Sequence, residues 1–68
     1  MVLRCFEVIK DGKVIAHYDL FKNGYRREVR SFNKVVFTGA FAEQEYEDTL
    51  NTCKQIAEID GSEIEIIK

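Results

Sequence analysis

The hydrophobic and polar positions of this chain follow two different periods, and one stretch has the period of a helix. Between Phe41 and Gly61 the apolar side chains recur every three or four residues, which gives one apolar face and one charged face. These apolar positions are Tyr46, Leu50, Cys53 and Ala57. Acidic residues crowd the first turns, where they favour the positive end of the helix dipole, and Gly61 is typical of a helix end. The pattern predicts one amphipathic helix.

The residues that precede this helix alternate in short runs typical of strands. Asp11-Gly12 separates Val2 to Lys10 from Lys13 to Phe21, and Asp-Gly favours a two-residue turn between paired strands. Asn23-Gly24 repeats this signal before a third run, Tyr25 to Phe32. The sequence therefore predicts two successive hairpins.

Two shorter runs complete the predicted sheet. Val35 to Thr38 is rich in strand-forming residues, and Ser62 to Lys68 alternates between glutamate and isoleucine. We therefore predict a two-layer α+β fold, a mainly antiparallel sheet with one helix packed on one face. The elements follow the order β-β-β-β-α-β within a single domain, residues 1–68. The pattern leaves open whether the last strand pairs with the first or the fourth.

The expected register of the first hairpin follows from its two-residue turn. It places Cys5 and Tyr18 on the face that the helix covers. It places Phe6, Val8 and Ile15 on the opposite face. A slip of one residue would exchange the two faces of a strand, because side chains alternate with a period of two.

The second hairpin is expected to continue this pattern. Its Asn-Gly turn pairs His17 with Arg30 on the uncovered face. The same register sets Asp19 opposite Glu28, which is a mismatch because like charges directly across a ladder are destabilising. The mismatch argues against this exact register but not against the hairpin, which is still predicted.

The uncovered face of the sheet predicts a partner. A single helix shields one side only, so large apolar side chains on the other side stay exposed unless a partner covers them. The expected partner-binding residues are Phe6, Val8, Ile15, His17, Arg26, Arg30 and Phe32. We interpret the chain as a small non-enzymatic interaction or regulatory module that binds a protein, either a second copy or another chain. The alternatives are binding of single-stranded nucleic acid by the same face, and a phage- or host-encoded inhibitor that occludes a larger complex.

Charge is divided unevenly along the chain, although the net charge is only −2. Residues 1–35 contain eight Lys and Arg against four acids, whereas residues 36–68 contain two Lys against eight acids. Such a division can steer an acidic partner toward the first half or align copies of the chain. The overall acidic balance argues against a dedicated nucleic-acid binder.

The sequence offers little support for catalysis or cofactor binding. His17 is the single histidine, and it lies in no recognised catalytic motif. Zinc usually takes four ligands, more than one histidine and two separated thiols supply, so no metal site, cofactor or catalytic residue is expected. Cys5 and Cys53 are interpreted as buried thiols or as one bridge between strand and helix. A membrane span is not expected, and the expected location is cytoplasmic.

Overall fold

The computed structural model describes residues 1–22, 24–29 and 33–68, and it confirms the predicted α+β fold. The elements are β1 (Arg4–Lys10), β2 (Lys13–Phe21), β3 (Gly24–Val29), β4 (Asn33–Thr38), α1 (Ala42–Asp60) and β5 (Glu63–Ile66). The strands form one five-stranded sheet in the order β4-β3-β2-β1-β5, and every neighbouring pair is antiparallel. The last strand therefore pairs with the first.

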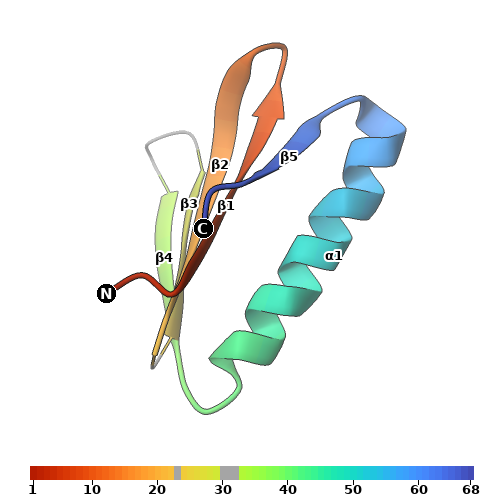
Figure 1. The fold of residues 1–68 in the computed structure, drawn as a ribbon. Helices are drawn as coiled ribbons and strands as arrows, with labels where there is room; N and C mark the ends of the chain where they lie inside the picture. The colour runs from red at the N-terminus through yellow and green to blue at the C-terminus, as the bar shows by residue number, and fades with distance from the viewer. Residues whose placement is uncertain (23, 30–32) are drawn as a thin grey trace.

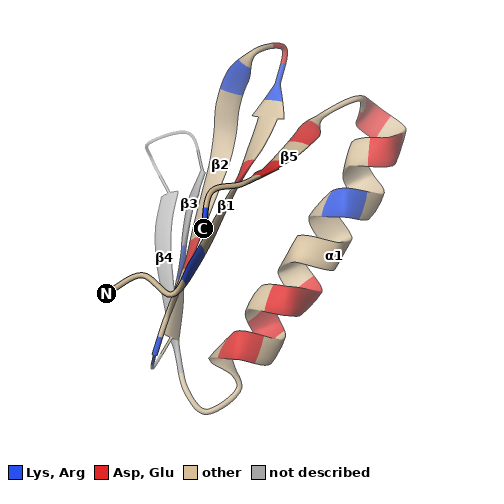
Figure 2. Cartoon of the chain, in the orientation of Figure 1, with Lys and Arg blue, Asp and Glu red and all other residues tan. Residues whose placement is uncertain are grey.

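The helix lies along one face of this sheet (Figure 1). It ends at Gly61, whose φ of 77° is left-handed and whose backbone N–H donates to the Ala57 carbonyl at 3.1 Å. At its start Phe41 makes no side-chain capping bond, and Glu43 and Glu45 occupy the first turn. Acidic residues lie near both ends of the helix (Figure 2). No helix in the described part of the chain is long and apolar enough to cross a membrane.

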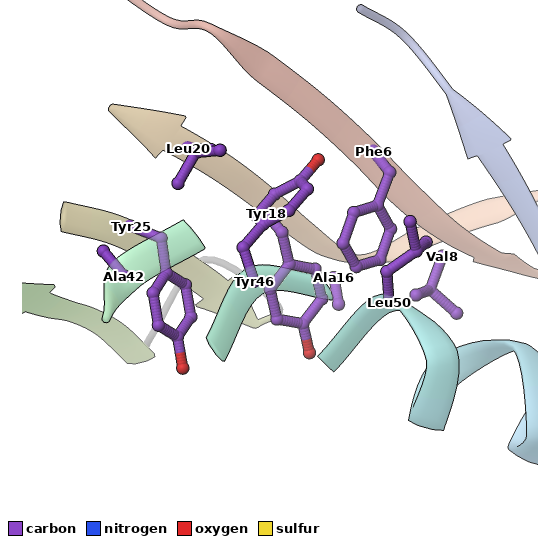
Figure 3. Packing of buried hydrophobic residues seen from close by; sticks show 9 residues of the cluster. All are labelled: Phe6, Val8, Ala16, Tyr18, Leu20, Tyr25, Ala42, Tyr46 and Leu50. Carbon is purple, nitrogen blue, oxygen red and sulfur yellow. The ribbon is translucent and has the colours of Figure 1, made fainter. Parts of the chain in front are cut away.

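The hydrophobic core lies between the helix and the first three strands. Its buried members are Phe6, Val8, Ala16, Tyr18, Leu20, Tyr25, Ala42, Tyr46 and Leu50 (Figure 3). Phe6 is completely buried: its ring stacks on Tyr18 with centroids 4.6 Å apart and meets Tyr46 edge-on at 5.4 Å. Aromatic side chains from β1, β2 and α1 thus join the two layers.

The register of the first hairpin differs from the prediction by one residue over most of its length. Ile9 pairs with Val14 as expected, but the register shifts between Val8 and Ile9, and Val8 pairs with Ala16. Ile15 is the extra residue on β2, which makes this a β-bulge. Compared with the prediction, the two faces of β1 are exchanged.

This bulge makes the predicted exposure of three residues wrong. Phe6 and Val8 are in the core beneath the helix, and Ile15 is half-buried and packs against that core. Because side chains alternate along β1, Cys5 and Glu7 take the uncovered face instead. Cys53 packs against the core from the helix, so the two cysteines lie on opposite sides of the sheet and form no disulfide.

The second hairpin pairs two positions away from its predicted register, which leaves the faces unchanged. Asp19 lies opposite Arg26, and His17 lies opposite Glu28. The expected pairing of Asp19 with Glu28 is therefore wrong, and an ion pair of opposite charges takes its place. The sheet face of β2 itself is as predicted, with Tyr18 toward the helix and His17 away from it.

Candidate functional site on the uncovered face of the sheet

The face of the sheet opposite α1, which we call the outer face, carries a mixture of charged and apolar side chains. By strand alternation and pairing its described members are Cys5, Glu7, Ile9, Val14, His17, Asp19, Phe21, Arg26, Glu63 and Glu65. Ile9 and Val14 lie at the hairpin end, and Phe21 and Arg26 lie toward the other end. The polar residues between them form the candidate site.

His17 is the centre of a hydrogen-bonded network. Its Nδ1 lies 2.9 Å from Oε2 of Glu7, directly across the β1–β2 ladder. Its Nε2 lies 2.8 Å from Oδ1 of Asp19, two residues along the same strand and face. As an imidazolium, His17 donates from both nitrogens to two carboxylates.

Arg26 completes the network from β3. Its Nε donates to Oδ2 of Asp19 at 3.1 Å, and a second guanidinium nitrogen donates to the same oxygen. The guanidinium also lies over the ring of Phe21, 5.3 Å from its centroid. Asp19 is only 2% exposed, and its two oxygens are taken by different cations.

Cys5 adds a thiol to this cluster. Its Sγ lies 3.5 Å from Nε2 of His17. The donor atoms of Cys5, His17 and Asp19 all lie within 4.8 Å of one another. Three different ligand types, sulfur, nitrogen and oxygen, therefore converge at one point of the outer face.

The electrostatics of the network follow from these contacts. Burial alone would raise the pKa of Asp19, but hydrogen bonds from Arg26, Cys5 and His17 outweigh it and lower that pKa. Burial alone would lower the pKa of His17, but hydrogen bonds and charge from Glu7 and Asp19 raise it. Both shifts favour the charged forms, an imidazolium between carboxylates.

The thiol of Cys5 is not activated as a nucleophile by this arrangement. Burial, followed by the hydrogen bond to Asp19 and the charges of Asp19 and Glu7, raises its pKa to about 11. Catalytic cysteines rely on a lowered pKa, because the thiolate is the attacking species. The geometry therefore supports an ion-pair network and a set of potential metal ligands better than covalent catalysis.

The structure brings together only part of the predicted partner surface. His17 and Arg26 both lie in the network: Arg26 pairs with Asp19, which is two residues from His17 on β2. Phe6, Val8 and Ile15 belong to the helix side. Two further predicted residues, Arg30 and Phe32, lie outside the described residues.

Three members of the network, Cys5, Glu7 and Asp19, were not predicted as site residues. The predicted register set Glu7 opposite Ala16 on the apolar face, and this buried carboxylate was the signal of an error. Shifting β1 by one residue sets Glu7 opposite His17 and Phe6 opposite Tyr18, which satisfies both faces.

Comparisons with known proteins add no assignment to this site: no protein-family model, no curated protein and no solved structure matches the chain.

Proposed function

We propose that this chain is a non-enzymatic protein-interaction module and that the outer face is its binding surface. The observation that carries the proposal is the one-sided cover of the sheet: α1 packs on the core face, and in the described part of the chain no second layer covers the other (Figure 1). Val14 stays 51% exposed on that face, beside the half-buried Ile9. Aromatic and arginine side chains, here Phe21 and Arg26, are enriched in protein interfaces.

The partner that best fits this face is a second copy of the chain. Three carboxylates, Glu7, Glu63 and Glu65, occupy outer-face positions on β1 and β5. On the opposite side of the sheet, the described basic residue at an outer-face position is Arg26 on β3. One side of the face therefore carries carboxylates, and the other carries Arg26.

A two-fold axis parallel to the strands makes this face complementary to itself. Such an axis sets the β5 side of one copy over the β4 side of the other, so unlike charges meet. It also keeps the hairpin ends together, so Ile9 and Val14 of the two copies meet each other. A single symmetry operation therefore satisfies the charged and the apolar parts of the face.

Single-stranded nucleic acid fits the same face less well. Its expected aromatic platform included Phe6, which is completely buried in the core. Glu7, Glu63 and Glu65 would lie against phosphates, whose contacts with proteins come from cationic side chains. Protein binding needs no rearrangement of these groups.

Sedimentation velocity over a range of protein concentrations tests the proposal. We expect a dimer that dissociates in Val14→Glu, because the new charge would be buried at the apolar end of the interface. The matched control is Ile59→Glu, which places the same charge on a helix residue that is 87% exposed and should leave the dimer intact. A wild-type chain that remains monomeric at every concentration, or equal behaviour of the two variants, would contradict it.

A charge reversal tests the orientation of the two copies. Glu63→Lys with Glu65→Lys changes two exposed residues of the edge strand and removes the acidic side of the face. Weaker association in this variant, and weaker association of the wild type at high salt, are expected from the axis parallel to the strands. Association that is insensitive to both changes would exclude that orientation.

A further inference from the structure

We propose that Cys5, His17 and Asp19 form a binding site for a zinc-type transition-metal ion, with a fourth coordination position left open. The inference goes beyond the proposed interaction, because it requires only groups that one chain holds together. It is based on the positions of three donor atoms, on the groups that orient them, and on the chemistry of the donor set.

The two separations that involve His17 Nε2 are close to those that a tetrahedral ion needs, and all three donor atoms lie within 4.8 Å of one another. With Zn–S bonds of about 2.3 Å and Zn–N or Zn–O bonds of about 2.0 Å, tetrahedral angles separate sulfur from nitrogen by about 3.5 Å and nitrogen from oxygen by about 3.3 Å. The observed separation of Cys5 Sγ from His17 Nε2 is 3.5 Å. His17 Nε2 and Asp19 Oδ1 are 2.8 Å apart, so an ion that replaces this hydrogen bond moves them apart by roughly half an ångström.

Two further groups orient the ligands in the manner of a metal site's outer shell. Glu7 Oε2 accepts from His17 Nδ1 at 2.9 Å, which leaves Nε2 to the ion, as in the carboxylate–histidine–zinc arrangement of many zinc proteins. Arg26 holds Oδ2 of Asp19 and thereby leaves Oδ1 directed toward Nε2. The sheet thus holds both the three ligands and the two groups that orient them.

The donor set selects the class of ion. Thiolate and imidazole ligands favour zinc and its neighbours in the transition series, whereas magnesium and calcium prefer oxygen ligands throughout. Three protein ligands with one open position are the composition of exchangeable or catalytic zinc sites, while structural sites have four protein ligands. We therefore expect reversible binding of zinc, which displaces the Cys5 thiol proton and the Nε2 proton of His17 to solvent, with Co²⁺ as a spectroscopic substitute.

The rigid part of the site is provided by the strands. Cys5 and Asp19 are paired directly across the β1–β2 ladder and are 5% and 2% exposed, so their donor atoms are fixed before an ion arrives. The side chain of His17 is 29% exposed and lies on the solvent side of the pair.

Titration of the full chain with Co²⁺ under reducing conditions tests the inference. A tetrahedral site with a cysteine ligand produces visible d–d bands and a near-ultraviolet sulfur-to-cobalt charge-transfer band, and zinc should abolish both by displacement. The chain contains two cysteines, so the charge-transfer band must come from Cys5 or Cys53.

The matched variants identify which cysteine binds. Cys53→Ser, at a half-buried helix position outside the cluster, should keep the band at full intensity, and Cys5→Ser should lose it. His17→Gln should lower the affinity for Co²⁺ at least tenfold, with circular dichroism confirming that each variant is folded. Absence of the band in the wild type, or its loss in Cys53→Ser, would overturn the proposal whether or not Cys5→Ser folds.

Discussion

Replacement of Phe6 by alanine is the sharpest test of how β1 is oriented. The side chain is 0% exposed, stacks on Tyr18 and meets Tyr46 edge-on. Truncation of a buried phenylalanine costs about 3–5 kcal/mol, which includes the cavity that it leaves. Folded domains have roughly 0.05–0.15 kcal/mol of stability per residue, or about 3–10 kcal/mol for a chain of this length. Phe6→Ala should therefore remove between about a third and all of the stability of the fold.

A milder change keeps the effect measurable. Phe6→Leu retains an apolar side chain but loses both ring contacts, and it should cost roughly 1–2 kcal/mol. The matched control is Phe41→Ala, because Phe41 is 75% exposed and makes no capping bond, so its effect should stay within about 0.5 kcal/mol. Urea unfolding followed by circular dichroism gives all three free energies, and comparison of the slopes checks that the unfolding stays two-state.

The result that would refute this reasoning is equality of the two alanine variants. If Phe6→Ala cost no more than Phe41→Ala, Phe6 would lie on the outer face. Cys5 and Glu7 would then point toward the helix, and the network around His17 would not exist.

The remaining predictions concern the network and the helix end. NMR titration of the metal-free protein should give His17 a pKa above its ordinary value of 6.5, and Glu7→Gln should bring that pKa down. Because folding raises the pKa of His17, the stabilisation from its protonated form is complete below pH 6.5 and is lost as the pH rises through the pKa of the folded state. Denaturant unfolding at several pH values should show this decline in the free energy of unfolding. A flat profile would argue against the network. Glu7→Gln should also weaken Co²⁺ binding by about 10–100-fold, and unchanged affinity would show that Glu7 does not orient the ligand. Gly61→Ala should destabilise the fold by about 1 kcal/mol in urea unfolding, because φ there is 77°; a neutral result would mean that the helix ends differently.

The sequence predicted the elements well because their signals are local. The helix has its own period and a terminal glycine, and Asp-Gly fixed the first turn without reference to the rest of the chain. The four strands before the helix and the one after it are all present. The position of β5 beside β1 depends on packing between residues far apart in the chain, so no local pattern could determine it.

The outer face was predicted less well because a single extra residue determines it. Val14, Ile15 and Ala16 are consecutive apolar residues, and alternation alone does not show that one of them is a bulge. The choice is made by the core, which buries Phe6 and Val8 against the helix in preference to Cys5. Only the shifted register of β1 places Cys5 and Glu7 beside His17.

Charge pairing across the strands agrees with the observed registers. The shifted first hairpin sets Glu7 opposite His17, and the shifted second hairpin sets Asp19 opposite Arg26. In both cases opposite charges replace a mismatch in the predicted register. The register predicted for the first hairpin also sets opposite charges together, Arg4 and Asp19, so charge pairing alone does not choose between the registers.

Nuclear Overhauser contacts from the His17 ring would show which side chains of β1 lie on the outer face. The outer-face network, the metal site and the proposed interface all depend on β1 presenting Cys5 and Glu7 to that ring. We predict contacts from His17 ring protons to the β protons of Cys5, together with contacts from the Phe6 ring to Tyr46. Contacts between the His17 and Phe6 rings, with none to Cys5, would contradict the account.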